Sequence, residues 1–236
     1  MPIFRAPNQS IRWLFAELTV VIVGILIAFQ VEEWRDTSNN RALVFAGLDA
    51  LLLELSDEGE VLERFANRAE AQASASREIV NRILQDEEIE EDWLIQTYRQ
   101  LISGLSWQPH NATYSSLLDS GNLYLLENSQ LETELFLYYE SQQFTEFIIA
   151  GSVDRANQLR SASLRDIHLV PALSSERART AIHIAKPIED FPRNSEFVGA
   201  VGNFGSIMVA VARRTRELRE MNDGLRDSIN AELDGR

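Results

Sequence analysis

Residues 14–34 read LFAELTVVIVGILIAFQVEEW, and the interpretation of the whole chain depends on this stretch. From Trp13 to Val31 there are 19 residues with a single charge, at Glu17. A helix rises ~1.5 Å per residue, so this run would cover about 28 Å, close to the ~30 Å hydrocarbon core of a bilayer. Trp13 and Trp34 bracket the run, as aromatic residues do at membrane interfaces. The stretch therefore predicts a transmembrane helix over residues 13–31.

An apolar run of this kind can also be a cleaved signal peptide or a buried core helix. A signal peptide has a shorter apolar region that is followed by small residues at a cleavage site, whereas residues 28–34 read AFQVEEW. A core helix of a soluble protein carries a polar stripe, and residues 18–29 have none. We therefore expect an anchor that is not cleaved.

Positive charge near the run predicts its orientation. The tail, residues 1–12, carries Arg5, Arg12 and the amino terminus, while the other flank has two arginines among acidic residues. Positive residues are retained in the cytoplasm. This rule predicts a cytoplasmic tail and an extracytoplasmic domain over residues 32–236. In a Gram-negative cell the anchor would lie in the inner membrane and the domain in the periplasm.

Several residues of the run are candidates for contacts within the membrane. Glu17 lies about one turn inside the interface, where it either snorkels to water or meets a partner helix. Gly24 and Ala28 form a small-xxx-small pair that lets two helices approach closely. From Gln30 onward the sequence becomes polar, as expected where the helix leaves the membrane. The candidate anchor and helix-contact residues are Trp13, Glu17, Gly24, Ala28, Gln30 and Trp34.

Composition and motifs exclude several classes of function. The net charge of −14 and the pI of 4.7 argue against a nucleic-acid partner. The chain has no cysteine, which excludes disulfides, thiolate zinc sites and cysteine nucleophiles. His110, His168 and His183 lack helical ligand spacing, and the acidic run at 86–92 lacks the spacing of a calcium loop. Because the motifs of nucleotide-binding, hydrolase and metalloprotease sites are also missing, we expect neither an enzyme nor a bound metal or cofactor.

Apolar residues recur at three- and four-residue steps through most of the domain, which predicts helices. Polar residues at 36–40 favour a kink or a new helix start there, although the anchor can also continue into the domain. Residues 170–195 contain three prolines and predict an irregular loop, with a short edge strand at 180–185. The sequence thus predicts an all-α fold, in which a transmembrane helix precedes a bundle of long antiparallel helices. The expected helices are 48–83, 93–102, 113–119 closed by a left-handed Gly121, a long helix from about 131 capped by Asn128 or Ser129, and 197–233.

Aromatic residues of the bundle offer a candidate pocket. A small ligand could lie near Trp107, Tyr114, Tyr138 and Phe144, although aromatic residues at helical spacing more often form core. The carboxylates of the helices, Glu54 among them, are expected on solvated outer faces.

The anchor reads ExxVxxVGILIAxQxxxW over residues 17–34, and the middle of the chain reads TYxxLxxSGxLxLxxN over residues 113–128. Together with the pair at 138–139 and the final charged helix, these motifs resemble an uncharacterised bacterial membrane family, the domain-of-unknown-function family numbered 6090. The chain departs from that pattern after Gln30, where Val-Glu-Glu replaces Ile-Asn-Asn. The resemblance implies a single-pass, mainly helical membrane protein and no established activity. It marks Thr113, Tyr114, Ser120 and Gly121 as motif residues.

Three functions remain open from the sequence. The first is a membrane-anchored interaction protein, a scaffold or accessory subunit that binds a protein partner or forms a homo-oligomer in the lipid bilayer. The second is an extracytoplasmic ligand-binding module that signals through a membrane partner. The third is an enzyme of unfamiliar type that uses the loop near His183 and Asp190.

Overall fold

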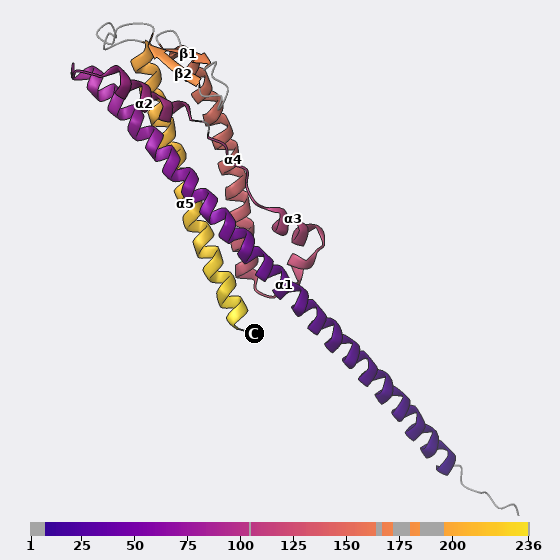
Figure 1. Ribbon diagram of the computed structural model, residues 1–236. Helices are drawn as coiled ribbons and strands as arrows, with labels where there is room; N and C mark the ends of the chain where they lie inside the picture. Colours follow the sequence, from indigo (N-terminus) through magenta and orange to yellow (C-terminus); the bar gives the residue numbers. More distant parts are fainter. Residues whose placement is uncertain (1–7, 104, 164–166, 172–179, 185–195, 236) are drawn as a thin grey trace, which may run out of the picture.

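The computed structural model, shown in Figure 1, describes residues 8–103, 105–163, 167–171, 180–184 and 196–235. Helices make up nearly all of these residues, so the all-α prediction is confirmed at that level. One small ribbon of two strands accompanies them. The elements in chain order are α1 (Asn8–Leu84), α2 (Glu91–Ile102), α3 (Ala112–Asp119), the 3₁₀ helix η1 (Asn122–Leu125), α4 (Ser129–Ser163), β1 (Ile167–Pro171), β2 (Thr180–Ile184) and α5 (Glu196–Asp234).

Helix α1 is a single helix of 77 residues, so the kink considered at 36–40 does not form. No glycine or proline occurs between Gly24 and Gly47 to break it. The hydroxyl of Thr37 donates to the backbone oxygen of Glu33 at 2.8 Å, within the helix, and does not cap a new one. The first part of α1 extends alone beyond the bundle, and its second part joins the bundle (Figure 1).

Three long helices form the body of the bundle. Helix α5 packs along both α1 and α4 and runs antiparallel to them (Figure 1). Leu51, Leu55 and Leu62 are fully buried on the inner face of α1. Burying one such side chain contributes roughly 1.5–3 kcal/mol. A second apolar cluster, where α2 folds against α1 and the start of α5, contains Ala75, Ile79, Ile83, Leu94, Tyr98, Leu101, Phe197, Val198 and Val201.

Small residues let α1 and α5 approach closely near the end of α1 and the start of α5. A β-carbon on Gly205 would lie only 2.8 Å from the β-carbon of Ser76. Ser76 Oγ donates to the backbone oxygen of Val201 at 2.6 Å, which ties the two helices at that point.

Local signals of the middle segment also appear as expected. Gly121 has φ +74°, the left-handed conformation predicted after 113–119. Asn128 Oδ1 accepts from the backbone N–H groups of Gln130 and Leu131, each at 3.1 Å, and so caps α4.

The segment predicted as an irregular loop at 170–195 contains strand residues. Strand β2 confirms the predicted edge strand, and it pairs antiparallel with β1, with His168 opposite His183. The loop prediction is therefore wrong for residues 170–171, which belong to β1. Asp190 lies outside the described residues.

The sequence predicts a membrane span at 13–31. No helix in the described part of the chain is long and apolar enough to cross a membrane, so this prediction is not confirmed.

Candidate functional site

Two acidic residues of α1 form the centre of the most polar part of the core. Glu54 and Glu58 are four residues apart and therefore lie on one face of the helix. That face also carries Leu51, Leu55 and Leu62 and points into the bundle. Glu58 is fully buried and Glu54 is partly buried, so the expected exposure of these carboxylates is wrong.

Glu58 accepts hydrogen bonds from two other segments. Its Oε1 accepts from Trp107 Nε1 at 3.0 Å and from Gln142 Nε2 at 3.3 Å. Its Oε2 accepts from the backbone N–H of His110 at 3.2 Å, and His110 Nδ1 lies 3.6 Å away. Gln142 Nε2 also donates to the backbone oxygen of His110 at 3.1 Å. One carboxylate thus joins α1, the segment between α2 and α3, and α4.

Glu54 makes a second junction one turn earlier. Its Oε2 accepts from the backbone N–H of Thr113 at 2.6 Å, and its Oε1 accepts from the hydroxyl of Tyr139 at 2.9 Å. Thr113 lies in the first turn of α3, where backbone N–H groups have no partner within the helix. Asn111, directly before α3, makes no side-chain capping bond. Glu54 therefore caps α3 from a different helix, and its charge favours that helix end.

Aromatic rings close the space around these two residues, which we call the carboxylate cluster (Glu54 and Glu58). Tyr114 of α3 stacks on Tyr139 of α4 with 3.9 Å between ring centroids. Tyr138 meets Tyr139 edge-on at 5.0 Å, and its hydroxyl accepts from Asn222 Nδ2 of α5 at 3.0 Å. Burial raises the pKa of both Tyr138 and Tyr139 well above the ordinary range, so both hydroxyls stay protonated at neutral pH.

The ionisation of Glu58 couples the cluster to pH. Burial raises the pKa of Glu58 above its ordinary value of 4.5. The backbone hydrogen bond from His110, the electrostatic effect of the His110 ring, and the side-chain hydrogen bonds from Trp107 and Gln142 all act in the opposite direction. Because the pKa of Glu58 is higher in the folded state than in the unfolded state, its contribution to the stability of the fold is fully present below the unfolded pKa. That contribution is lost as the pH rises through the folded pKa.

We therefore expect the stability of the wild type relative to Glu58→Gln to increase as pH falls from about 7 toward 4.5. Urea unfolding of both full-length proteins in mild detergent, followed by circular dichroism, measures this difference. Taking the difference removes the pH dependence of every other carboxylate. A difference that stays constant over this range would contradict the buried position of the ionised group.

The chemistry of the cluster is that of a structural junction. The Glu58 oxygens and both Glu54 oxygens already accept bonds from protein donors, so a substrate would have to displace them. Among the described residues, no group of three or more His, Asp or Glu side chains could hold a metal ion. The cluster fastens the segment before α3 onto the bundle.

The residues predicted to line a pocket fall into two groups. Trp107, Tyr114 and Tyr138 are buried together in the core around the carboxylate cluster. Phe144 does not join them, because its side chain is 54% exposed on the outer side of α4. The expectation that Phe144 lines a pocket or forms part of the core is therefore wrong. Arg214 of α5 lies over the Phe144 ring at 5.3 Å.

The remaining motif residues of the middle segment shape the chain locally. Thr113 meets Glu54 through its backbone, and Ser120 Oγ donates to the backbone oxygen of Leu117 at 3.2 Å. Gly121 supplies the left-handed turn after α3. The candidate anchor residues Trp13, Glu17, Gly24, Ala28, Gln30 and Trp34 are all exposed on the projecting part of α1.

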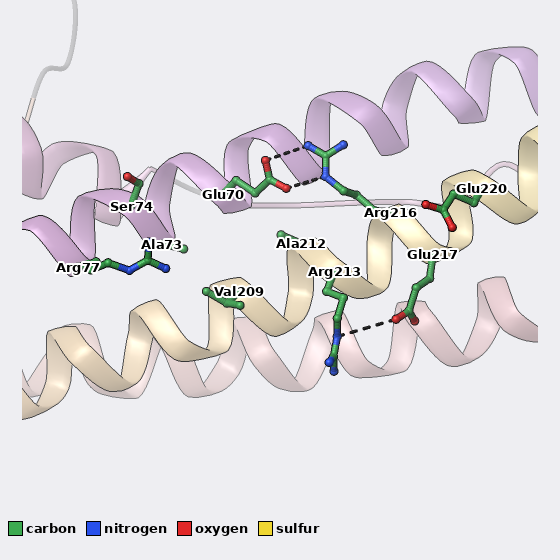
Figure 2. Close-up of a pocket in the computed structure, with 10 residues that line it drawn as sticks. All are labelled: Glu70, Ala73, Ser74, Arg77, Val209, Ala212, Arg213, Arg216, Glu217 and Glu220. Carbon is green, nitrogen blue, oxygen red and sulfur yellow. Dashed lines mark hydrogen bonds and ion pairs between the residues drawn. The ribbon is translucent and has the colours of Figure 1, made fainter.

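A shallow groove of about 530 Å³ lies between α1 and α5 (Figure 2). Its floor is made of small apolar residues such as Ala73 and Ala212, and charged residues line its sides. Arg216 donates to Glu70 through two bonds, of 2.6 and 2.8 Å, which lowers the pKa of Glu70. Both side chains are largely exposed, so this pair adds little to stability. The charged groups of Arg216 and Glu70 at the groove are therefore already bonded to each other, across α1 and α5.

Sequence reasoning missed the carboxylate cluster together with Gln142 and Asn222. One signal was present, since Glu58 falls in the same helical phase as Leu51, Leu55 and Leu62. An acidic residue in an apolar phase indicates a buried carboxylate that needs donors. Its donors come from residues 49 to 84 positions further along, so no local pattern could identify them.

Comparisons with protein-family models, with curated proteins and with solved structures found no match to this chain. The resemblance to the family numbered 6090 therefore stays a prediction.

Proposed function

We propose that the chain is a single-pass, membrane-anchored interaction protein, a scaffold or accessory subunit with an extracytoplasmic helical domain. The observation that carries this proposal is the environment of residues 18–31. Ten large apolar residues in that range are between 47% and 72% exposed, and they point in every direction around α1. A helix that is apolar all round requires an apolar surrounding. Since α1 projects from the bundle here, a bilayer is the surrounding that fits.

The length of the run supports the same proposal. In the sequence the run starts at Trp13, and Trp13 and Trp34 lie 21 residues apart, or about 31 Å along a helix. Both indole rings are exposed, by 70% and 73%, as expected for residues at the two interfaces.

The orientation proposed for the domain rests on the arginines of the tail. With the tail in the cytoplasm, α1 leaves the membrane near Trp34 and continues as one helix into the domain. Apart from Trp34, residues 32–39 between membrane and bundle are polar and exposed, so they suit water.

An interaction role fits the bundle better than a ligand-binding role. Trp107, Tyr114 and Tyr138, which could have lined a pocket, fill the core. The stacking of Tyr114 on Tyr139 at 3.9 Å leaves no space between those rings. Both carboxylates of the cluster are engaged by protein donors, while Gln142 Oε1 and Asn222 Oδ1 are buried without a hydrogen-bond partner. The surface of the domain remains as the part available to a partner.

The anchor is tested by alkaline extraction of membranes followed by flotation in a density gradient. We expect the wild type to float with the lipid, and the variant Ile22→Arg/Ile25→Arg to lose membrane association. Each arginine at the centre of a span costs roughly 2.5–3.5 kcal/mol on insertion scales. Leu53→Arg is the matched control, because Leu53 is 71% exposed on α1 within the bundle. A wild type that is extracted into the aqueous fraction would contradict the anchor.

A second arm of this experiment tests the orientation. The chain has no cysteine, so Tyr124→Cys introduces a single thiol on an exposed side chain of the domain. We expect a membrane-impermeant maleimide to label it from outside the inner membrane. Labelling only after the membrane is broken would place the domain in the cytoplasm.

A further inference from the structure

The outer face of α4, opposite the core, is apolar. Tyr138, Gln142 and Ile149 point inward and are buried. On the other side Phe136 is 57% exposed and Phe147 is 73% exposed. Exposed apolar patches of this kind mark surfaces that contact another molecule. The exposed apolar residues of this face are Phe136, Leu137, Phe144 and Phe147.

The upper half of this face has the shape of a helix-packing surface. At about 100° per residue, Phe144, Phe147 and Gly151 lie along one line of α4. Gly151 is exposed, and a β-carbon there would meet nothing within 4 Å. A glycine inside a helix lowers helix stability, and no contact with another described residue explains this one. Gly151 leaves a notch beside Phe147 into which a second helix can pack.

Two opposite charges flank this line. Asp154 and Arg155 are both exposed, and the helical geometry places them roughly 50° to opposite sides of it. If two copies of α4 meet in parallel about a two-fold axis, the Arg155 side of one copy faces the Asp154 side of the other. Symmetry then produces this pairing twice.

We propose that the face formed by Phe144, Phe147, Gly151, Asp154 and Arg155 binds the same face of a second copy of the chain. The proposal rests on the membrane anchor, which orients both copies in the same direction and makes a parallel arrangement the only accessible one. Anchoring also raises the effective concentration of one copy near another, so a modest contact suffices.

The size of the surface agrees with this. A phenylalanine can bury ~150–250 Å², so the exposed parts of Phe144 and Phe147 supply about 250 Å² of apolar area per copy. That is the apolar centre of an interface smaller than the standard ~800 Å² per partner, as expected for a pair that is tethered to one membrane.

Glu140 is the one charge on this line below Phe144, and two copies of it would repel each other. It lies seven residues before Phe147, or ~10 Å along the helix. Helices that pack through ridges of residues four apart cross at about 50°, so they diverge at that distance from the crossing point. The Phe147–Gly151–Arg155 ridge therefore forms the contact, and water separates the Glu140 side chains.

Photo-crosslinking in membranes tests the partner. Phe147 is replaced by the photoreactive p-benzoyl-phenylalanine, which keeps an aromatic ring, and the same residue at Leu53 is the control. We expect irradiation at position 147 to yield an adduct of two copies, at twice the chain mass of 26.8 kDa, and little at position 53. An adduct with a different protein, or none, would overturn the proposal.

Charge exchange tests the parallel geometry. Asp154→Arg and Arg155→Asp are each expected to reduce the adduct roughly fivefold to tenfold, because each creates two like-charge contacts. The double variant exchanges both charges and is expected to restore the yield to within about twofold. Failure of the double variant to recover would overturn the proposed pairing. A folding defect cannot imitate this recovery, since both side chains are exposed.

Alkaline extraction of the same membranes separates the two proposals. A chain that resists extraction but forms no adduct contradicts the pairing alone. A chain that is extracted and still shows loss and recovery through charge exchange contradicts the anchor alone.

Discussion

Replacing Glu58 with alanine is expected to lower the free energy of unfolding by about 3–5 kcal/mol. The substitution removes the acceptor of Trp107 Nε1, Gln142 Nε2 and the backbone N–H of His110. These donors stay buried or partly buried without a partner, and each such loss costs roughly 1–3 kcal/mol. The missing side chain also leaves a cavity at a position with no solvent exposure. Urea unfolding of the full chain in mild detergent, followed by circular dichroism, measures the change.

Two other variants separate this effect from a general loss of acidic charge. Glu60→Ala removes an exposed carboxylate that pairs with Arg64 at 3.2 Å, and its expected cost is at most ~0.5 kcal/mol. Glu58→Gln keeps the shape and one acceptor oxygen, so its cost should lie between the two. Trp107 lies against Phe65 in the core, and its fluorescence should shift toward that of a solvated indole in Glu58→Ala. Equal stability of Glu58→Ala and Glu60→Ala would show that the junction contributes nothing.

Replacing Gly205 with alanine is expected to lower the free energy of unfolding by about 2–3 kcal/mol. The added β-carbon would lie 2.8 Å from the β-carbon of Ser76, which cannot move without moving the backbone of α1. Ser76 Oγ also holds its hydrogen bond to Val201 on the same side, so a shift would strain or break it. The two helices must separate locally, and the packing of the bundle weakens along that contact. The same unfolding measurement in detergent gives the value.

Gly224→Ala is the matched control in the same helix. Gly224 is exposed, and a β-carbon there would meet nothing within 4 Å. Alanine favours the helix over glycine by roughly 0.5–1 kcal/mol, so this variant should be more stable than the wild type. If the free energy of unfolding falls for Gly205→Ala and rises for Gly224→Ala, the effect at Gly205 comes from the close approach of the helices and not from helix propensity. A neutral or stabilising Gly205→Ala would contradict the close contact.

Much of the fold could be predicted from the sequence because its signals are local. The apolar period of the final helix extends over 197–233, and α5 covers Glu196–Asp234. Gly121 and Asn128 act within a few residues of their own position, which is why Gly121 was predicted and Asn128 was one of the two caps expected. Helix α5 runs antiparallel to α1 and α4, but α1 and α4 run in the same direction because α2 and α3 lie between them in the chain, so the antiparallel prediction holds only for the pairs that include α5.

The polar centre of the bundle could not be predicted in the same way. Whether a carboxylate such as Glu54 is solvated depends on which segments cover it, and the covering segments here come from α3 and α4. Phe144 illustrates the reverse case, since its apolar character suggested core while its place on α4 leaves it 54% exposed. The polar residues at 36–40 matched a helix start, yet the uninterrupted hydrogen bonding of α1 passes through them.

The sequence by itself determined the helices, their approximate ends and the apolar run at 13–31, because backbone periodicity, caps and hydropathy depend on neighbouring residues. Only the tertiary structure decided that Glu58 accepts hydrogen bonds from two other segments, and that Gly205 is a point of close approach. It also decided that one side of α4 remains apolar and exposed. The physical reason is that burial and hydrogen-bond partners belong to pairs of residues far apart in the chain, and only packing brings them together.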